Sequence, residues 1–265
     1  SDESISPDEI ERVVHATTLF TNALIENKGA RTALLTTEGF RDNLEIGRER
    51  KYDLYDLAAK KPRQLVPRDL RFEVRERLLA DGSVHQALDL PALDDVAAAL
   101  DHAGVTSLAI VFLHSYRNSS HERAAGARIT ELLPELAVSL SADVAPEIRE
   151  FERASTTVAN AYIKPLARDY LDALGQRLDD RKISASLLLM LSSGGLTHVG
   201  EVRRTPVQML ESGPAAGALA AANIGRAEGL DHVLAFDMGG TTAKLCLIDG
   251  EEPAIAYRFE AAREK

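Results

Sequence analysis

The apolar positions of the chain switch repeatedly between the spacing of a helix and the spacing of a strand. Helical spacing from Ser6 to Gly29 predicts a first helix, for which Ser6 is a suitable N-cap and Gly29 a suitable end. Short apolar runs predict strands further on, with helical segments between them. The predicted strands are 33–36, 72–74, 107–113, 137–140, 187–191, 233–236 and 245–248, and the later predicted helices are 93–103, 120–133, 154–178 and one from Pro214. Such alternation predicts α/β layering.

The last two predicted strands, of which the first is expected to be buried, are joined by a turn that carries candidate chemistry. Gly239 and Gly240 permit positive φ and, because they lack Cβ atoms, let a bulky anion approach the backbone. The turn amides and the hydroxyls of Thr241 and Thr242 would form a concavity suited to phosphate. Asp237, at the end of the first strand, is placed to hold a hydrated Mg²⁺ or a reacting water. The alternative is an ordinary Gly-Gly hairpin beside an acidic residue.

Two further glycine-rich segments favour a ligand site. Segment 192–195 follows a predicted strand, and segment 211–217 leads into an alanine-rich helix. Ser212 is predicted to cap that helix, whose N-terminus would offer partial positive charge and free amides to phosphate. Small residues also suit tight helix–sheet packing, so both interpretations stay open. Three such segments near strand ends or helix starts predict one ligand cradle built from several loops.

Composition narrows the class of protein. The chain has 265 residues, of which 45% are hydrophobic, so one large domain or two smaller ones can each bury a core. A net charge of −10 gives no support for a nucleic-acid partner. No apolar run approaches the length of a membrane span, and no signal-peptide pattern is present. The single cysteine, Cys246, excludes an internal disulfide and favours a reducing compartment, so a cytoplasmic location is expected.

Other polar stretches are weaker candidates. The residues 15–18 and Asn22 could supply polar groups to a ligand, although a lone histidine on a helix is usually structural. Segment 47–77 is locally basic and could face an anionic ligand or a partner subunit, and a solvated irregular surface is the alternative. Asp81-Gly82 predicts a hairpin turn. The sequence contains no P-loop, no Gly-x-Gly-x-x-Gly turn, no His-Glu-x-x-His or Cys-x-x-Cys zinc motif and no Gly-x-Ser-x-Gly elbow.

Taken together, these segments resemble the hydantoinase A/5-oxoprolinase family, and they follow the order of that family over nearly the whole chain. The matching segments are HATT at 15–18, TNALIE at 21–26, RTALLTTEGFRD at 31–42, EIGR at 45–48, DLYD at 53–56, EIREFERASTT at 147–157, SSGG at 192–195, ESGPAAG at 211–217 and DMGGTT at 237–242. The resemblance implies an actin-like (ribonuclease H-like) α/β ATPase fold that is incomplete in this chain. Residues 1–154 would be the N-terminal region without its first phosphate hairpin, and 155–265 the start of the ATP-binding domain.

The resemblance also implies a reaction, namely ATP-dependent opening of a cyclic amide such as a hydantoin, 5-oxoproline or a lactam. ATP would phosphorylate the ring carbonyl oxygen and thereby make it a better leaving group when water attacks. ATP and Mg²⁺ are the implied cofactors. The implied nucleotide contacts are Ser193, Gly194, Gly195, Glu211, Ser212, Gly213, Gly239, Gly240, Thr241 and Thr242, with Asp237 on the Mg²⁺–water side and with Arg41, Asp42 and Arg48 as candidate substrate contacts.

Two departures from the family pattern change these expectations. The family's first phosphate hairpin, Asp-x-Gly-Gly-Thr, does not occur, because the chain starts after its expected place. The chain is therefore expected to be a piece of a longer polypeptide, and this fragment alone to release no phosphate from ATP in a malachite-green assay. Many family members also carry aspartate where this chain has Lys244.

Partners and alternative functions follow from the same resemblance. A hydantoinase B-type partner subunit or region and an oligomeric state are expected, with no nucleic-acid or membrane partner. An ATP-dependent ketone carboxylase subunit is one alternative function. A non-catalytic nucleotide-binding module of actin-like fold is another.

Overall fold

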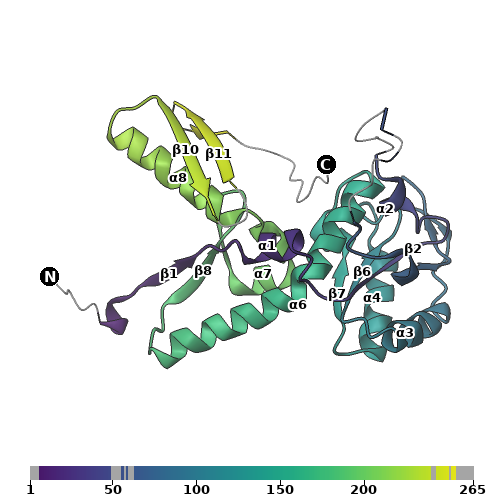
Figure 1. Cartoon of the computed structure of the whole chain (residues 1–265). Helices are drawn as coiled ribbons and strands as arrows, with labels where there is room; N and C mark the ends of the chain where they lie inside the picture. Colours follow the sequence, from purple (N-terminus) through teal and green to yellow (C-terminus); the bar gives the residue numbers. More distant parts are fainter. Residues whose placement is uncertain are drawn as a thin grey trace. The chain divides into compact units, whose positions relative to one another are not determined.

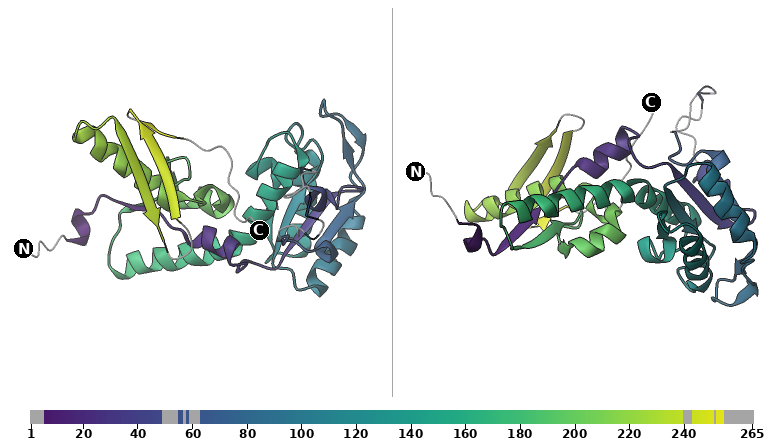
Figure 2. Two further views of the ribbon diagram at one scale, coloured as in Figure 1. Left: turned by 45° about the horizontal axis from the view of Figure 1, so that its top comes forward. Right: turned by 90° about the horizontal axis from the view of Figure 1, so that it is seen from below.

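The chain forms two compact units, which interleave along the sequence. The computed structural model describes residues 6–48, 55, 56, 58, 63–239, 243–250 and 252–254. The first unit contains the described residues of Ser1–Glu26 and Ala167–Ala261, and the second those of Asn27–Leu166. Helix α6 (Glu150–Asp180) belongs to both, since its first part lies in the second unit and its last part in the first (Figures 1 and 2). The predicted division at residue 154 stays a prediction.

The second unit is built on a parallel sheet in the strand order β3-β2-β6-β7. Every residue of β2 and β6 is buried. Because successive side chains of a strand face opposite sides, both faces of this sheet are covered. The elements of this unit are β2 (Thr32–Thr37), α2 (Asn43–Ile46), η2 (Arg68–Leu70), β3 (Arg71–Val74), β4 (Arg77–Leu78), β5 (Val84–Gln86), α3 (Ala92–His102), β6 (Ser107–Val111), α4 (Ser120–Leu132), β7 (Ala137–Leu140) and α5 (Ser141–Val144). The predicted strands and helices of this part are confirmed to within a few residues.

The first unit contains two small sheets and the helix α8. Strands β1, β8 and β9 form one sheet, and β10, β11 and β12 form the other. Helix α8 packs along β10 and β11 (Figure 1). Its elements are η1 (Pro7–Glu9), β1 (Arg12–His15), α1 (Leu19–Ile25), β8 (Ser186–Met190), β9 (Leu196–His198), α7 (Val199–Arg204), η3 (Pro206–Met209), α8 (Ser212–Ala227), β10 (His232–Met238), β11 (Ala243–Asp249) and β12 (Glu252–Pro253).

The helix predicted from Ser6 to Gly29 is wrong in its first half. Strand β1 lies there and pairs in parallel with β8, so that Val13 is opposite Leu187. Its β-branched residues suit a strand, and the hydrogen bonds offered by β8 outweigh the local helical spacing. The helix that does form, α1, begins only at Leu19.

The strand predicted at 233–236 is confirmed, but the expectation that it is buried is wrong. Leu234 and Phe236 are 58% and 59% exposed. The opposite face lies against α8, where a Cβ atom added to Gly225 would come within 2.7 Å of the Val233 side chain. The apolar run therefore predicted the strand correctly but not its burial, because helix α8 covers only one of the strand's two faces.

A buried carboxylate connects the ends of two strands, β6 and β7, in the second unit. Glu122, at the start of α4, accepts hydrogen bonds from the amides of Phe112 and Ala142, both at 2.9 Å, and from the Ser141 hydroxyl. Burial raises the pKa of Glu122, and these three donors oppose that rise. Close to the same network, Arg153 donates to the carbonyl oxygen of Phe112 at 2.6 Å. The carboxylate thus satisfies backbone groups that no other described residue reaches.

Replacing Glu122 by alanine is expected to destabilise the protein strongly. The variant leaves the buried amide of Phe112 and the partly buried amide of Ala142 without their acceptor, and it removes a negative charge that favours the buried Arg153 guanidinium, which together cost about 3–5 kcal/mol. The matched control is Arg123→Ala at the neighbouring position, which removes an exposed pair with Asp143 and should cost less than about 1 kcal/mol. Urea unfolding measures both. Equal losses in the two variants would contradict this role of Glu122.

Candidate functional site

The start of helix α8 is fixed by the segment that follows β1. The hydroxyl of Ser212 accepts a hydrogen bond from the Thr17 amide at 3.3 Å and donates one to the Thr17 carbonyl oxygen at 3.2 Å. The Glu211 amide donates to the hydroxyl of Thr21 at 3.2 Å. Ser212 is fully buried. The hydroxyls of Ser212 and Thr21, together with the backbone of Thr17 and Glu211, therefore fix the N-terminus of α8.

The prediction that Ser212 caps α8 is wrong. Ser212 is the first helical residue, and the N-cap position is held by Glu211 in the left-handed conformation, with φ 65° and ψ 15°. No side chain caps the helix. Among the described residues, the amides of Ser212 and Gly213 have no hydrogen-bond acceptor. A Cβ atom at Gly213 would lie 3.3 Å from the Thr18 methyl group, so glycine permits this close approach.

The second glycine-rich segment lies against the same helix. Residues 191–195 form a tight turn in which the Leu191 amide donates to the Gly195 carbonyl oxygen at 2.8 Å. Gly194 has a φ of +84°, and a Cβ atom there would come within 2.9 Å of the Leu219 side chain of α8. Ser193 lies in the same turn and is exposed. Glycine is required at position 194 by both its conformation and its contact with α8.

The third segment, the end of the β10–β11 hairpin, also reaches α8. Asp237 on β10 is paired with Lys244 on β11 in the antiparallel ladder. The ammonium group of Lys244 forms an ion pair with a carboxylate oxygen of Glu211. Gly239 follows β10, whereas Gly240, Thr241 and Thr242 lie outside the described residues. In the described part of the chain, the three glycine-rich segments thus meet around one helix.

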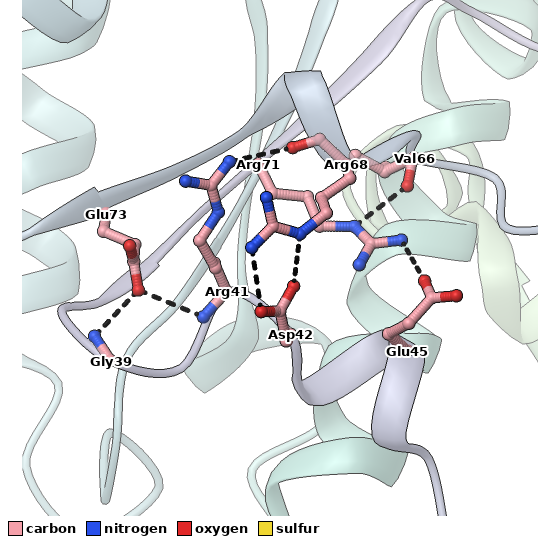
Figure 3. A network of polar contacts seen from close by, with 8 residues as sticks. All are labelled: Gly39, Arg41, Asp42, Glu45, Val66, Arg68, Arg71 and Glu73. Atoms are coloured by element: carbon pink, nitrogen blue, oxygen red, sulfur yellow. Dashed lines mark hydrogen bonds and ion pairs between the residues drawn. The ribbon is translucent and has the colours of Figure 1, made fainter.

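The candidate substrate residues Arg41 and Asp42 lie in the second unit, within a network of ion pairs (Figure 3). Asp42 accepts two hydrogen bonds from Arg68, at 2.8 and 3.0 Å, and these bonds hold the pKa of the Asp42 carboxyl below its ordinary value. Arg41 donates to the Arg68 carbonyl oxygen at 3.2 Å, and its amide donates to Glu73 at 3.2 Å. The buried Nε atom of Arg41 has no hydrogen-bond partner.

Arg48, the third candidate substrate residue, is also paired. Its guanidinium donates to Glu152 at 3.0 Å and lies 5.7 Å from the ring centre of Phe151. Arg48 is therefore engaged within the second unit, on the first part of α6. The structure gives each of the three candidates a partner inside its own unit.

The polar residues after β1 act differently from their prediction as ligand groups. Thr17 and Thr21 position the start of α8, and sequence reasoning missed this role although it singled out the segment. His15 lies 2.6 Å through Nε2 from the hydroxyl of Tyr170. Burial lowers the pKa of His15, because it disfavours the charged form of the ring. Thr17 contacts Ser212 through its backbone and Thr21 contacts the Glu211 amide through its hydroxyl, so no side-chain pattern in the sequence identifies this role for both residues.

Solved structures with the same arrangement define the class of the fold. An ATP-dependent caprolactamase from Pseudomonas jessenii superposes with a TM-score of 0.82 at 34% identity, over 91% of this chain and 35% of that chain. The nucleotide-free structure of an acetone carboxylase, from work on ATP-dependent acetone carboxylation, gives a TM-score of 0.81 at 26% identity, again over 91% and 35%. These neighbours carry the actin-like ATPase fold. The predicted fold class, α/β and actin-like, is confirmed.

Family profiles and curated relatives agree with this class. The hydantoinase/oxoprolinase N-terminal region matches residues 1–133, and the hydantoinase/oxoprolinase profile matches residues 153–265. The chain belongs to the hydantoinase/oxoprolinase family. It is 35% identical to the caprolactamase subunit alpha of Pseudomonas jessenii, over 89% of this chain and 34% of that protein. It is 32% identical to 5-oxoprolinase 1 of Arabidopsis thaliana, over 93% and 21%. The chain thus spans about a third or less of these relatives.

Two general features of the described residues bear on metal and membrane binding. Within that part of the chain, no group of three or more His, Cys, Asp or Glu side chains is arranged to hold a metal ion. Magnesium sites at nucleotides use one or two carboxylates together with phosphate oxygens and water, so Asp237 suits such a site chemically. No helix among the described residues is long and apolar enough to cross a membrane.

His15 is expected to titrate below its ordinary value of 6.5 in the folded protein. Since burial disfavours the charged ring, the stability that depends on neutral His15 is fully present above pH 6.5 and is lost as the pH falls through the lowered folded pKa. An NMR titration of the imidazole measures this, with His15→Gln to assign the signal. Exposed His85 serves as the reference histidine. A His15 midpoint at or above 6.5 would contradict the prediction.

Proposed function

We propose that this chain is the ATP-binding subunit or region of an enzyme that opens cyclic amides. In the proposed reaction, the ring carbonyl oxygen of a hydantoin, 5-oxoproline or lactam attacks the γ-phosphorus of ATP and ADP leaves. Phosphorylation makes the ring carbon more electrophilic than that of an unactivated amide, so water adds to it and the ring C–N bond breaks. A second water then releases the phosphate as inorganic phosphate. Positioning and charge neutralisation are the protein's main contributions to such a transfer.

The observation that carries the proposal is the meeting of the three glycine-rich segments around α8. The turn with Gly194 packs on the helix, Glu211 begins it, and the hairpin end with Asp237 reaches it through Lys244. Backbone without side chains, unpaired amides and a helix N-terminus are what a phosphate chain requires. The family to which the chain belongs contains ATP-dependent enzymes, which supports ATP as the ligand.

Each residue has a role in this proposal. Asp237 would hold the hydrated Mg²⁺ or the reacting water, because it stands near the end of β10 opposite Lys244, which pairs with Glu211 at the start of α8. The residues proposed to contact the nucleotide are Ser193, Gly194, Gly195, Glu211, Ser212, Gly213, Gly239, Gly240, Thr241 and Thr242. Arg41, Asp42 and Arg48 are proposed substrate contacts. A hydantoinase B-type partner is also proposed, and the relative named as a subunit supports a multi-subunit assembly.

Replacing Asp237 by asparagine should abolish most cyclic-amide-dependent ATP consumption by the intact protein. The substitution keeps the size of the side chain and removes its charge, and loss of a group that serves metal or water costs about 100-fold or more in kcat. The matched control is Asp249→Asn, which removes a carboxylate at the other end of the same hairpin, where it pairs with His232. ADP release is measured against hydantoins, 5-oxoproline and larger lactams.

The outcomes of this experiment separate the candidate functions. Amide-dependent ADP release that falls in Asp237→Asn and persists in Asp249→Asn supports the proposal. ATP consumption that requires bicarbonate and a ketone would instead assign the chain to a ketone carboxylase, the function of the acetone carboxylase relative. Nucleotide binding without any substrate-dependent turnover would favour a non-catalytic module. Equal activity of the two variants would contradict the role of Asp237.

A further inference from the structure

We propose that Lys244 is the cation that binds the phosphate chain, and that Glu211 competes with the phosphate for it. The inference rests on the proposed function and adds a device that sets nucleotide affinity. In the free protein, the Glu211 carboxylate holds the Lys244 ammonium group. On binding, the ammonium group exchanges this carboxylate for a phosphate oxygen.

The ion pair between Glu211 and Lys244 lies between the start of α8 and the β10–β11 hairpin. Glu211 stands at the N-cap of α8, where its amide is held by Thr21. Lys244 is paired with Asp237 across the hairpin, and side chains of such a pair project from the same face, with Cβ atoms about 5 Å apart. The ammonium group therefore lies where the hairpin end and the helix start meet. A cation at that place adds to the positive end of the helix dipole.

The charge balance of the site is the second argument. Glu211, Asp237 and Lys244 together carry a net charge of −1 before any ligand binds, and the Glu211 carboxylate neutralises the Lys244 ammonium group. A triphosphate would meet repulsion from this cluster if Glu211 kept the ammonium group neutralised. A phosphate oxygen that takes the ammonium group from Glu211 gains a charge-assisted hydrogen bond, which offsets this repulsion.

The incomplete pairing of Glu211 is the third argument. Its carboxylate oxygen Oε2 binds Lys244, whereas Oε1 is buried and has no hydrogen-bond partner. A buried unsatisfied carboxylate oxygen is costly, so the arrangement without ligand is not the best that this side chain can adopt. The side chains of Glu211 and Lys244 are 20% and 24% exposed, which gives both of them room to turn. The pair is thus suited to exchange of partners.

The test compares dissociation constants of the intact protein for MgATP and for adenosine, measured by calorimetry. Lys244→Met should weaken ATP about 10- to 100-fold, as expected for loss of a hydrogen bond to a charged group, and leave adenosine unchanged. Glu211→Gln should tighten ATP by about threefold or more, since an exposed pair is worth up to about a fivefold change. The matched controls are Lys182→Met in the α6–β8 turn and Glu228→Gln after the end of α8, both exposed.

The possible outcomes distinguish failure of this inference from failure of the proposed function. If Lys244→Met weakens ATP and adenosine alike, Lys244 is structural and the inference fails while the proposed function stands. If Glu211→Gln weakens ATP, the carboxylate of Glu211, and not only its backbone, serves the nucleotide, and the competition is refuted. If the unaltered protein binds neither ligand, the proposed function fails together with the inference. Opposite shifts for the two variants, with unchanged controls, support the exchange.

Discussion

The arrangement of the first unit depends on how the start of helix α8 is held. The reciprocal hydrogen bonds between Ser212 and Thr17, together with the bond from Glu211 to Thr21, fix that end against a segment nearly two hundred positions earlier in the chain. Once it is fixed, the helix provides one surface on which the turn at Gly194 and the hairpin β10–β11 both pack. The unpaired amides at its N-terminus follow from the same geometry.

The second unit gains its stability from a different constraint, the coverage of a parallel sheet on both faces. Its strands end among buried polar groups, so side chains such as Glu122 must satisfy backbone amides that water cannot reach. Glu76 is another buried carboxylate of this unit. It shares a hydrogen bond of 2.7 Å with the His121 ring and contacts the Thr37 hydroxyl. Glu122 thus provides acceptors for amides after the ends of β6 and β7, whereas Glu76 engages the side chains of His121 and Thr37.

The sequence allowed prediction of most elements that local patterning determines. The strands of the second unit were predictable because long apolar runs are buried on both faces, and its helices because apolar positions recur at helical spacing. Among the described glycines of the three segments, only Gly194 has a positive φ, and Gly194 and Gly213 allow close contacts. Strand β1 was not predictable, since its conformation depends on distant β8. The burial of β10 was overestimated, because the pattern shows a strand but not how many of its faces are covered. The ion pair between Glu211 and Lys244 was missed, because only the packing of the hairpin on α8 brings these residues together.

In the proposed function, three separate loops bind one phosphate chain. Hydrogen–deuterium exchange of the intact protein, with and without MgATP, tests it most directly because it reports on the backbone amides themselves. The account predicts that peptides covering residues 192–195, 211–213 and 237–239 are protected together by the nucleotide, while the hairpin β4–β5 is unaffected. Protection of only one of these segments, or of none of them, would contradict the account.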